Sequence, residues 1–219
     1  MRLRPLLLAS AVLAGPAFAA EAAPAAEVQT LDCAAPFNKE TTEADLIATF
    51  GKENVEYKTV PGAEGTETNA SVLFPNDPAK SLTVYWWDEE KRARPAAVTM
   101  QSDFSADPEG IDPWKREILW QIPEGLKIGS PVADVEKANG KPFKMSGFGW
   151  DYGGFAISWE GGKLDAEQRN GCSLLMRFSP QGETTPEAAL GDVELMSDSK
   201  DMAASNARVI EISISYPSE

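Results

Sequence analysis

The sequence predicts an α+β protein built from two tandem units, each with short helices followed by a four-stranded antiparallel sheet. Three observations predict this class. One helical pattern occurs twice, with a constant offset of 89 residues. Each copy is followed by short segments that alternate apolar and polar residues or are rich in β-branched and aromatic residues, as strands are. Turn residues separate these segments at short intervals, which is typical of an antiparallel arrangement.

The clearest stretch runs from Gly125 to Trp159. Ser130 can cap a helix, Pro131 fits its first position, and Gly140 can end it. Beyond this helix the apolar period changes to that of strands on both sides of a turn at Asp151–Gly154. The second half of the stretch therefore predicts a β-hairpin.

The first copy of the helix begins at Thr41 and ends at Gly51, so a hydroxyl residue starts both helices and a glycine stops both. The triplet Ala44-Asp45-Leu46 corresponds to Ala133-Asp134-Val135, and Gly51-Lys52 corresponds to Gly140-Lys141. Repetition of both signals indicates a copied folding unit. We expect strands at 54–60, 70–74, 81–88 and 96–101 in the first unit, and at 143–150, 155–160, 172–179 and 207–215 in the second.

Shorter helices are expected upstream of each main helix, at 32–37 and 112–121. The polar segment 103–111 is the natural linker between a first unit at 32–102 and a second at 112–219. The largest interruption, 180–206, predicts a loop that packs or functions, with a short helix near 197–204.

The N-terminal segment has the pattern of an export signal. Arg2 and Arg4 precede an apolar run, and Ala17-Phe18-Ala19 provides a cleavage site, so we expect residues 1–19 to be a signal peptide. Residues 20–31 are rich in Ala, Pro and Glu and predict a disordered leader. No later apolar segment reaches the roughly 20 residues that a membrane span needs. The sequence thus predicts a periplasmic or secreted bacterial protein without a membrane anchor.

Charge and cysteine content narrow the class further. The formal net charge of −14 disfavours nucleic acid or anionic lipid as a partner and suits either a solvated surface or a basic partner. Cys33 and Cys172 are the two cysteines of the chain, and an exported protein favours a disulfide between them. Closing a loop of this size would contribute roughly 5 kcal/mol by the chain-entropy relation.

The composition argues against the common catalytic chemistries. The chain has no histidine, which excludes histidine general bases, the usual triads and most zinc sites. Paired carboxylates could hydrolyse glycosides, but no motif selects a pair. The acidic segment beginning at Asp103 suggests calcium but fails the EF-hand pattern, since Pro108 stands where glycine is needed. We therefore expect no enzyme activity, no cofactor and no metal.

Aromatic residues are the main candidates for a binding surface. Adjacent strand residues point to opposite faces, so one of Trp86 and Trp87 should enter the core and the other should lie outside. Exposed tryptophan is a frequent hot-spot residue at interfaces, whereas large aromatics also fill the space between sheet and helices. Trp120 and Trp159 are the strongest core candidates. The candidate binding surface comprises Trp86, Trp87, Trp150, Asp151 and Tyr152.

The last three of these residues lie at the expected hairpin turn. Its glycines permit positive φ and Asp151 can hydrogen-bond the turn backbone, so a purely structural role would explain them. The functional alternative is that the turn presents Tyr152 beside a carboxylate, a combination suited to a basic protein or a sugar.

The repeated helix, with its Ala-Asp-Leu/Val and Gly-Lys motifs, and the tryptophan-rich strands resemble the β-lactamase-inhibitor-protein-like fold, over nearly all of residues 33–216. The same unit occurs singly in a small lipoprotein of the outer-membrane assembly machinery. The segment GFGWDYGG, residues 147–154, also looks like a signature of exported bacterial proteins. The resemblance implies a concave sheet presented to another macromolecule.

The sequence therefore predicts an exported, non-enzymatic binding protein, an inhibitor or envelope adaptor that recognises a basic protein. A small-ligand or glycan-binding module that uses Trp and Asp side chains between the two units is the alternative. A third reading is that the duplication serves only stability within a larger envelope assembly.

Overall fold

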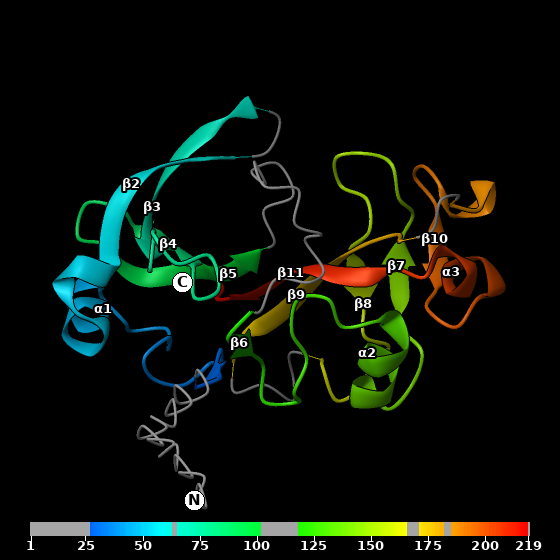
Figure 1. The fold of residues 1–219 in the computed structure, drawn as a ribbon, viewed down its shortest axis with the longest axis horizontal. Coiled ribbons are helices and arrows are strands. Elements are labelled where there is room, and N and C mark those ends of the chain that lie inside the picture. Colours follow the sequence, from blue (N-terminus) through cyan, green and yellow to red (C-terminus); the bar gives the residue numbers. More distant parts are fainter. Residues whose placement is uncertain (1–26, 63–64, 102–117, 166–170, 182–184, 219) are drawn as a thin grey trace, which may run out of the picture.

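The computed structural model of the protein describes residues 27–62, 65–101, 118–165, 171–181 and 185–218. The expected signal peptide, most of the leader and the linker at 103–111 lie outside this part of the chain. The described residues have an α+β fold with few helices and several sheets (Figure 1), which confirms the predicted class. No helix in these ranges is long and apolar enough to cross a membrane.

The largest sheet has six strands in the order β2-β3-β4-β5-β11-β9, and every neighbouring pair is antiparallel. Consecutive strands from the first half of the chain thus form one side of the sheet, and strands from the second half extend it. The six strands are β2 (Val55–Pro61), β3 (Glu67–Leu73), β4 (Leu82–Asp88), β5 (Ala93–Gln101), β9 (Ser173–Ser179) and β11 (Arg208–Ser215).

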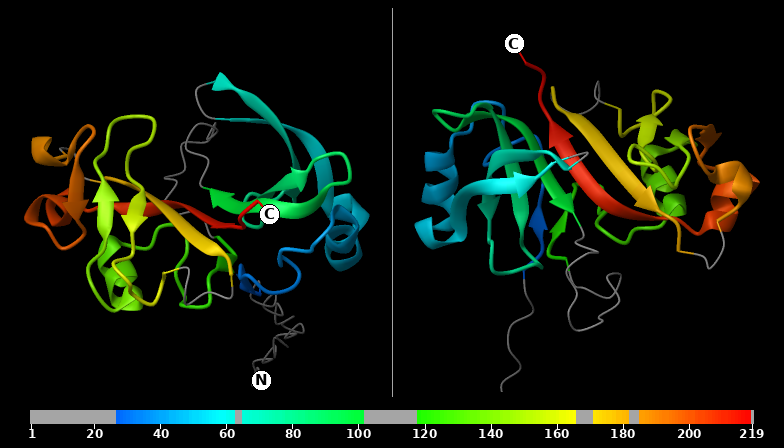
Figure 2. Two further views of the ribbon diagram at one scale, coloured as in Figure 1. Left: turned by 180° about the vertical axis from the view of Figure 1, so that it is seen from behind. Right: turned by 90° about the horizontal axis from the view of Figure 1, so that it is seen from above.

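Strand β11 joins the two halves of the chain. On one side Glu211 lies opposite Gln101 of β5, and on the other side it lies opposite Arg177 of β9. The pairing with β5 continues to Ser215 opposite Ala97. One continuous hydrogen-bonded sheet therefore connects residues of both halves (Figures 1 and 2).

Two smaller sheets complete the fold. A three-stranded antiparallel sheet has the order β10-β7-β8, from β7 (Lys144–Ser146), β8 (Ala156–Ser158) and β10 (Glu194–Met196). The strands β1 (Gln29–Thr30) and β6 (Trp120–Gln121) form a short parallel pair.

The four strands expected in the second half are all present but are divided between two sheets. β7 and β8 have three residues each and pair across a register shift, whereas β9 and β11 belong to the six-stranded sheet. An isolated bridge between Phe155 and Arg177 is the link from the β8 segment to β9. The expected single four-stranded sheet is thus interrupted, and β10, from the segment predicted as a loop, occupies the free edge of β7.

Three α-helices lie where the sequence predicts helices: α1 (Glu43–Phe50), α2 (Val132–Asn139) and α3 (Lys200–Ser205). Two caps differ from the prediction. Thr42 rather than Thr41 caps α1, through reciprocal hydrogen bonds with Asp45, because the Thr41 hydroxyl instead donates to the carbonyl oxygen of Pro36. The hydroxyl of Ser130 accepts from the Lys127 amide, which leaves Pro131 at the start of α2 without a side-chain cap.

The upstream helices predicted at 32–37 and 112–121 are not formed where the structure describes these residues. Residues 32–37 form bends and turns, and Pro36, which lacks an amide hydrogen, cannot extend a helical ladder. Trp120–Gln121 is strand β6, and residues 112–117 lie outside the described part. The last residues of the expected leader are structured, because Gln29–Thr30 pair with β6. Short 3-10 helices occur at Lys52–Asn54 and Glu187–Ala189.

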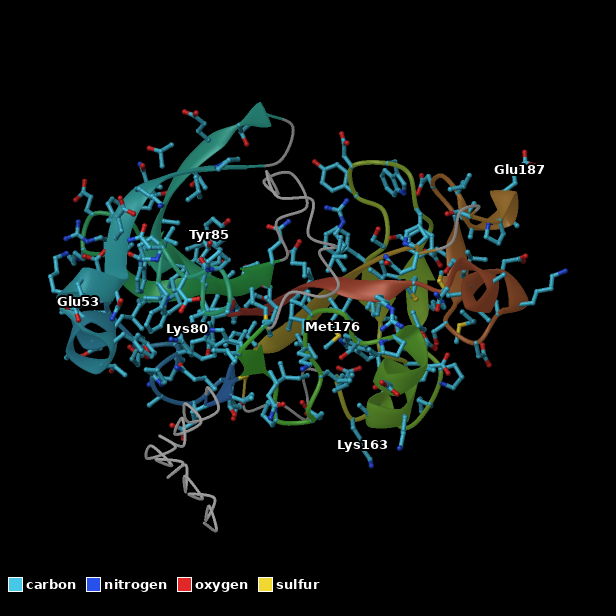
Figure 3. All side chains as sticks on the ribbon, viewed as in Figure 1. Glu53, Lys80, Tyr85, Lys163, Met176 and Glu187 are labelled. Carbon is cyan, nitrogen blue, oxygen red and sulfur yellow. A yellow bond between two sulfur atoms is a disulfide. The ribbon has the colours of Figure 1, made fainter. Side chains whose placement is uncertain are left out.

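One face of the six-stranded sheet packs into the core and is called the core face. The opposite face is called the second face. Core-face residues are opposite one another across the strands, as Val84, Val98 and Ile214 are, and all three are completely buried. Figure 3 shows Tyr85 and Met176 on opposite sides of the sheet, with Met176 on the core face. Trp120 and Trp159 are both buried, as the sequence predicts for its two core candidates.

The disulfide between Cys33 and Cys172 is present, as predicted, and the sequence separation of its cysteines is 139. Cys33 follows β1, and Cys172 directly precedes β9. The bond therefore fastens the N-terminal segment to an edge of the six-stranded sheet.

Candidate functional site

The candidate surface residues fall into one buried and two exposed groups. Trp86 is 5% exposed and Trp87 is 47% exposed, so the predicted division between the two faces of β4 is correct. The indole nitrogen of Trp86 donates to the hydroxyl of Ser71 at 2.9 Å. Trp86 is part of the core and is removed from the candidate binding surface, since a partner cannot reach it.

Trp87 lies apart from the other exposed candidates. Its indole nitrogen donates to the carbonyl oxygen of Tyr216 at 3.0 Å, next to the end of β11. Trp150 and Tyr152 instead lie between β7 and β8, with ring centroids 5.8 Å apart in an edge-on arrangement.

The segment of residues 147–154, here called the aromatic loop, carries the second exposed group. Trp150 and Tyr152 are 36% and 49% exposed, and Asp151 between them is also exposed. Figures 1 and 2 show this segment and the β2–β3 hairpin extending to the same side of the long strands, whereas α2 lies on the other side. The second face of the sheet thus lies between two projecting elements.

Hydrogen bonds hold the backbone of the aromatic loop in place. The amide of Gly154 donates to the carbonyl oxygen of Gly147, and the amide of Gly153 donates to that of Trp150. The hydroxyl of Ser146 donates to the carbonyl oxygen of Tyr152, and the indole nitrogen of Trp150 donates to that of Gly147. The two exposed rings therefore project from an ordered support.

Close packing explains why glycines occupy this loop. A side chain at Gly154, where φ is 81°, would overlap the backbone oxygen of Phe178 on β9. A Cβ at Gly147 would lie 2.5 Å from the carbonyl oxygen of Gly191. The loop consequently lies directly against both β9 and the segment around Gly191.

The segment 189–193 adds apolar residues that the sequence analysis missed. The amide of Phe148 donates to the carbonyl oxygen of Ala189, and the amide of Gly191 donates to that of Phe148, each at 2.8 Å. This pairing places the exposed side chains of Leu190 and Val193 beside the loop. Their signal in the sequence is weak: Leu190 and Val193 flank a Gly-Asp turn in a short, partly apolar stretch that shows neither a helical nor a clear strand period.

Arg177 of β9 is a further residue that the sequence analysis missed. Its Nε donates to the carbonyl oxygen of Gly153 and its Nη2 donates to that of Asp151, both at 2.9 Å. The guanidinium also lies 4.9 Å from the ring centroid of Phe155. A lone arginine in an apolar strand was the signal that could have indicated this role.

A hollow of about 490 Å³ lies between the aromatic loop, β9 and the 189–193 segment. Phe148 and Phe178 are buried at its base, and Trp150 and Leu190 are partly exposed on its wall. Its volume is within the range of ligand-binding pockets.

The segment that contributes Leu190 to this hollow is acidic. Glu187, Asp192, Glu194 and Asp198 are exposed on the segment that also carries Leu190, and Lys200 is the one exposed cation among the described residues 185–200. Charges of this sign attract a basic partner over the distance that screening allows, about 10 Å at moderate salt.

Glu211 on β11 is a largely buried carboxyl opposite Arg177. Burial raises the pKa of this carboxyl, and the nearby Arg177 charge lowers it to a smaller extent. Burial and the charge of Glu211 also raise the pKa of Tyr85. These groups lie on the second face of the sheet, where Glu211 is opposite Gln101 and Arg177.

Among the residues that the structure describes, no group of three or more Cys, Asp or Glu side chains is arranged to hold a metal ion. The acidic segment that begins at Asp103 lies outside that part. Comparisons with protein-family models, curated proteins and solved structures gave no match.

Proposed function

We propose that the protein is an exported, non-enzymatic binding protein that recognises a basic protein partner, as an inhibitor or an envelope adaptor. The observation that carries this proposal is the exposed pair Trp150 and Tyr152 on a loop whose backbone is fixed by hydrogen bonds. Exposed aromatic side chains on a pre-ordered loop lose little conformational entropy on binding, so their burial favours association.

Two further features support the proposal. The exposed apolar residues Leu190 and Val193 extend the aromatic surface, and Glu187, Asp192 and Glu194 are exposed on the same segment. An apolar centre with a polar rim is the usual composition of a protein interface. The Cys33–Cys172 disulfide supports export, because disulfides persist mainly in oxidising compartments.

The proposal also includes the tandem organisation and its resemblance to the β-lactamase-inhibitor-protein-like fold. In support, α1 precedes β2, β3, β4 and β5, which are neighbours in that order. Likewise α2 precedes β7, β8, β9 and β11, which follow one another through the Phe155–Arg177 bridge. The last strands of the two sets, β5 and β11, pair with each other. The second faces of the two sets of strands therefore adjoin.

Capture from envelope extract tests the function. The immobilised full chain is compared with a Trp150→Ala/Tyr152→Ala double variant and with Ile157→Ala as the matched control. Ile157 is also an exposed apolar residue, but it lies on β8 and lines a different hollow. We expect a basic protein to bind the wild type and the control. Loss of two hot-spot residues should weaken its affinity at least about 30-fold.

Salt gives a second test of the same proposal. Raising the ionic strength should lower the association rate with a basic partner, because it screens the acidic rim. Recovery of the same proteins on all three chains, or of none at low and moderate salt, would contradict the proposed function.

A further inference from the structure

The hollow beside the aromatic loop is lined by both apolar and polar residues. Phe148, Trp150, Leu190 and Ile210 contribute apolar side chains to it, and Ser179 and Thr185 are polar. Among the lining residues that the structure describes, Arg177 is the cation and Asp151 is the anion.

Two of the five N–H donors of Arg177 are engaged within the protein. Nε and Nη2 donate to the carbonyl oxygens of Gly153 and Asp151, and one face of the guanidinium lies over the ring of Phe155. An anionic ligand that used these two donors would have to compete with the loop carbonyls. The arginine therefore supports the wall of the hollow through the protein's own backbone.

The walls are also fixed in position. Phe148 and Leu190 form an isolated parallel bridge, and the indole nitrogen of Trp150 is bonded to the carbonyl oxygen of Gly147. A hollow whose walls do not need to move favours insertion of a side chain, since little ordering accompanies binding.

We infer that this hollow accepts an uncharged apolar side chain of the protein partner, leucine or a residue of similar shape, while the acidic rim contacts flanking lysine or arginine residues. The inference rests on the proposed function and specifies the partner's chemistry: a segment with an apolar anchor between cations. Charge supports this assignment, because the exposed carboxylates of Glu187, Asp192 and Glu194 are not among the lining residues, whose described members carry one charge of each sign.

Small probes test the hollow without the partner. The methyl groups of the full chain are observed by NMR during titration with N-acetylleucinamide, N-acetylargininamide or di-N-acetylchitobiose. We expect the leucine probe to shift the methyl signals of Leu190 and Ile210 with a Kd on the order of 1–10 mM, as befits a fragment of this size. The arginine and sugar probes should bind at least about tenfold more weakly.

A pair of variants separates this inference from the proposed function. Leu190→Trp places a larger side chain on the wall of the hollow, and Ile157→Trp adds the same ring elsewhere. Leu190→Trp should abolish the leucine-probe shifts and weaken partner capture at least tenfold, whereas Ile157→Trp should do neither. Signal dispersion in the spectra verifies that both variants are folded.

The results have distinct meanings. Absence of any leucine-probe shift in the wild type, or equal binding of the arginine or sugar probe, overturns the inference. Partner capture that is unchanged by Leu190→Trp also overturns it and leaves the proposed function standing. Failure of the wild type to capture a partner contradicts the proposed function itself.

Discussion

Glu43 connects three elements of the first half of the chain through a largely buried carboxylate. One oxygen accepts a hydrogen bond from the hydroxyl of Ser71 on β3 at 2.7 Å, and that hydroxyl accepts one from the indole of Trp86 on β4. The other oxygen lies 3.0 Å from Nε of Arg92, close enough for an ion pair but poorly aligned for a hydrogen bond. The start of α1 is thereby attached to two neighbouring strands.

Removal of this carboxylate should destabilise the protein. In Glu43→Ala, Ser71 loses its acceptor and Arg92 loses its counter-ion, so we expect the free energy of unfolding to fall by about 1–3 kcal/mol. The partial exposure of Arg92 limits the electrostatic share. Urea denaturation followed by tryptophan fluorescence measures the change. Glu40→Ala, at an exposed ion pair, is the control and should stay within about 0.5 kcal/mol of the wild type.

Glu211 provides a prediction about pH. Its pKa is raised from 4.5 in the folded chain because burial penalises the carboxylate, so folding favours the protonated form. Above the unfolded pKa, ionisation therefore costs stability, and this cost grows until pH passes the raised folded pKa. Glu211→Gln avoids it.

We expect the stability of Glu211→Gln relative to the wild type to increase between about pH 4 and pH 7. Denaturation curves collected across this range measure the effect, with the exposed Glu90→Gln as a control for the removal of one negative charge. A difference between Glu211→Gln and the wild type that stays constant with pH would contradict the assigned environment.

Alternation along the sequence predicted which face a residue occupies but not the detailed partner of its polar atoms. The opposite orientations of Trp86 and Trp87 follow from strand geometry alone. The shift of the cap from Thr41 to Thr42 does not, because it depends on the carbonyl oxygen of Pro36, which only the folded turn brings within reach of Thr41.

At the scale of elements, Arg177 determines how the aromatic loop is attached to β9. The side chain spans from one edge of the six-stranded sheet to two carbonyl oxygens of the loop. An arginine can make both bonds at once because its guanidinium is a planar fork, whereas a lysine is a single point donor.

Arg177→Ala should therefore loosen the loop without unfolding the sheet. Loss of two hydrogen bonds at about 1 kcal/mol each predicts roughly 30-fold faster hydrogen exchange at the amides of Gly153 and Gly154. Arg177→Lys should give an intermediate increase. Arg208→Ala removes a comparable bond to the carbonyl oxygen of Gly129 and is the control. Unchanged exchange in Arg177→Ala would show that the glycine contacts alone hold the loop.

The type and position of the main elements were predictable, whereas their pairing was not. Helix caps and alternation gave α1, α2 and the strands, since these signals are local. The strand β10 was missed because Glu194–Met196 has only three residues, too few to show a strand period, and pairs with the edge of β7, which is distant in sequence. The segment 32–37 resembles a helix start in composition, but its turn at Ala34–Phe37 is fixed by packing of Phe37 against Trp120.

At the scale of the whole molecule, β11 joins β5 and β9 across large sequence separations. No local pattern specifies such a pairing, because many alternating strands could neighbour one another equally well. The acidic residues near the site were likewise evident from the sequence only as part of the net charge. Their grouping around the aromatic loop depends on the backbone pairing of Phe148 with Ala189 and Gly191.

The disulfide stabilises this long-range arrangement. The sequence separation of its two cysteines is 139, and the bond fixes the segment after β1 to the start of β9. The chain-entropy relation predicts a contribution of about 5 kcal/mol for a loop of this length. Cys33→Ser/Cys172→Ser should consequently lower the free energy of unfolding by about 2–5 kcal/mol, as measured by urea denaturation.

The single variant Cys172→Ser separates loss of the bond from loss of the side chains. It retains the Cys33 thiol but cannot form the disulfide, so its free energy of unfolding should fall nearly as far as that of the double variant. The slope of the free energy of unfolding against urea concentration should be smaller for the wild type than for the two variants, because the disulfide keeps the unfolded wild-type chain more compact. Equal slopes and equal stability in all three chains would show that β11, and not the disulfide, is sufficient to hold the N-terminal segment and β9 together.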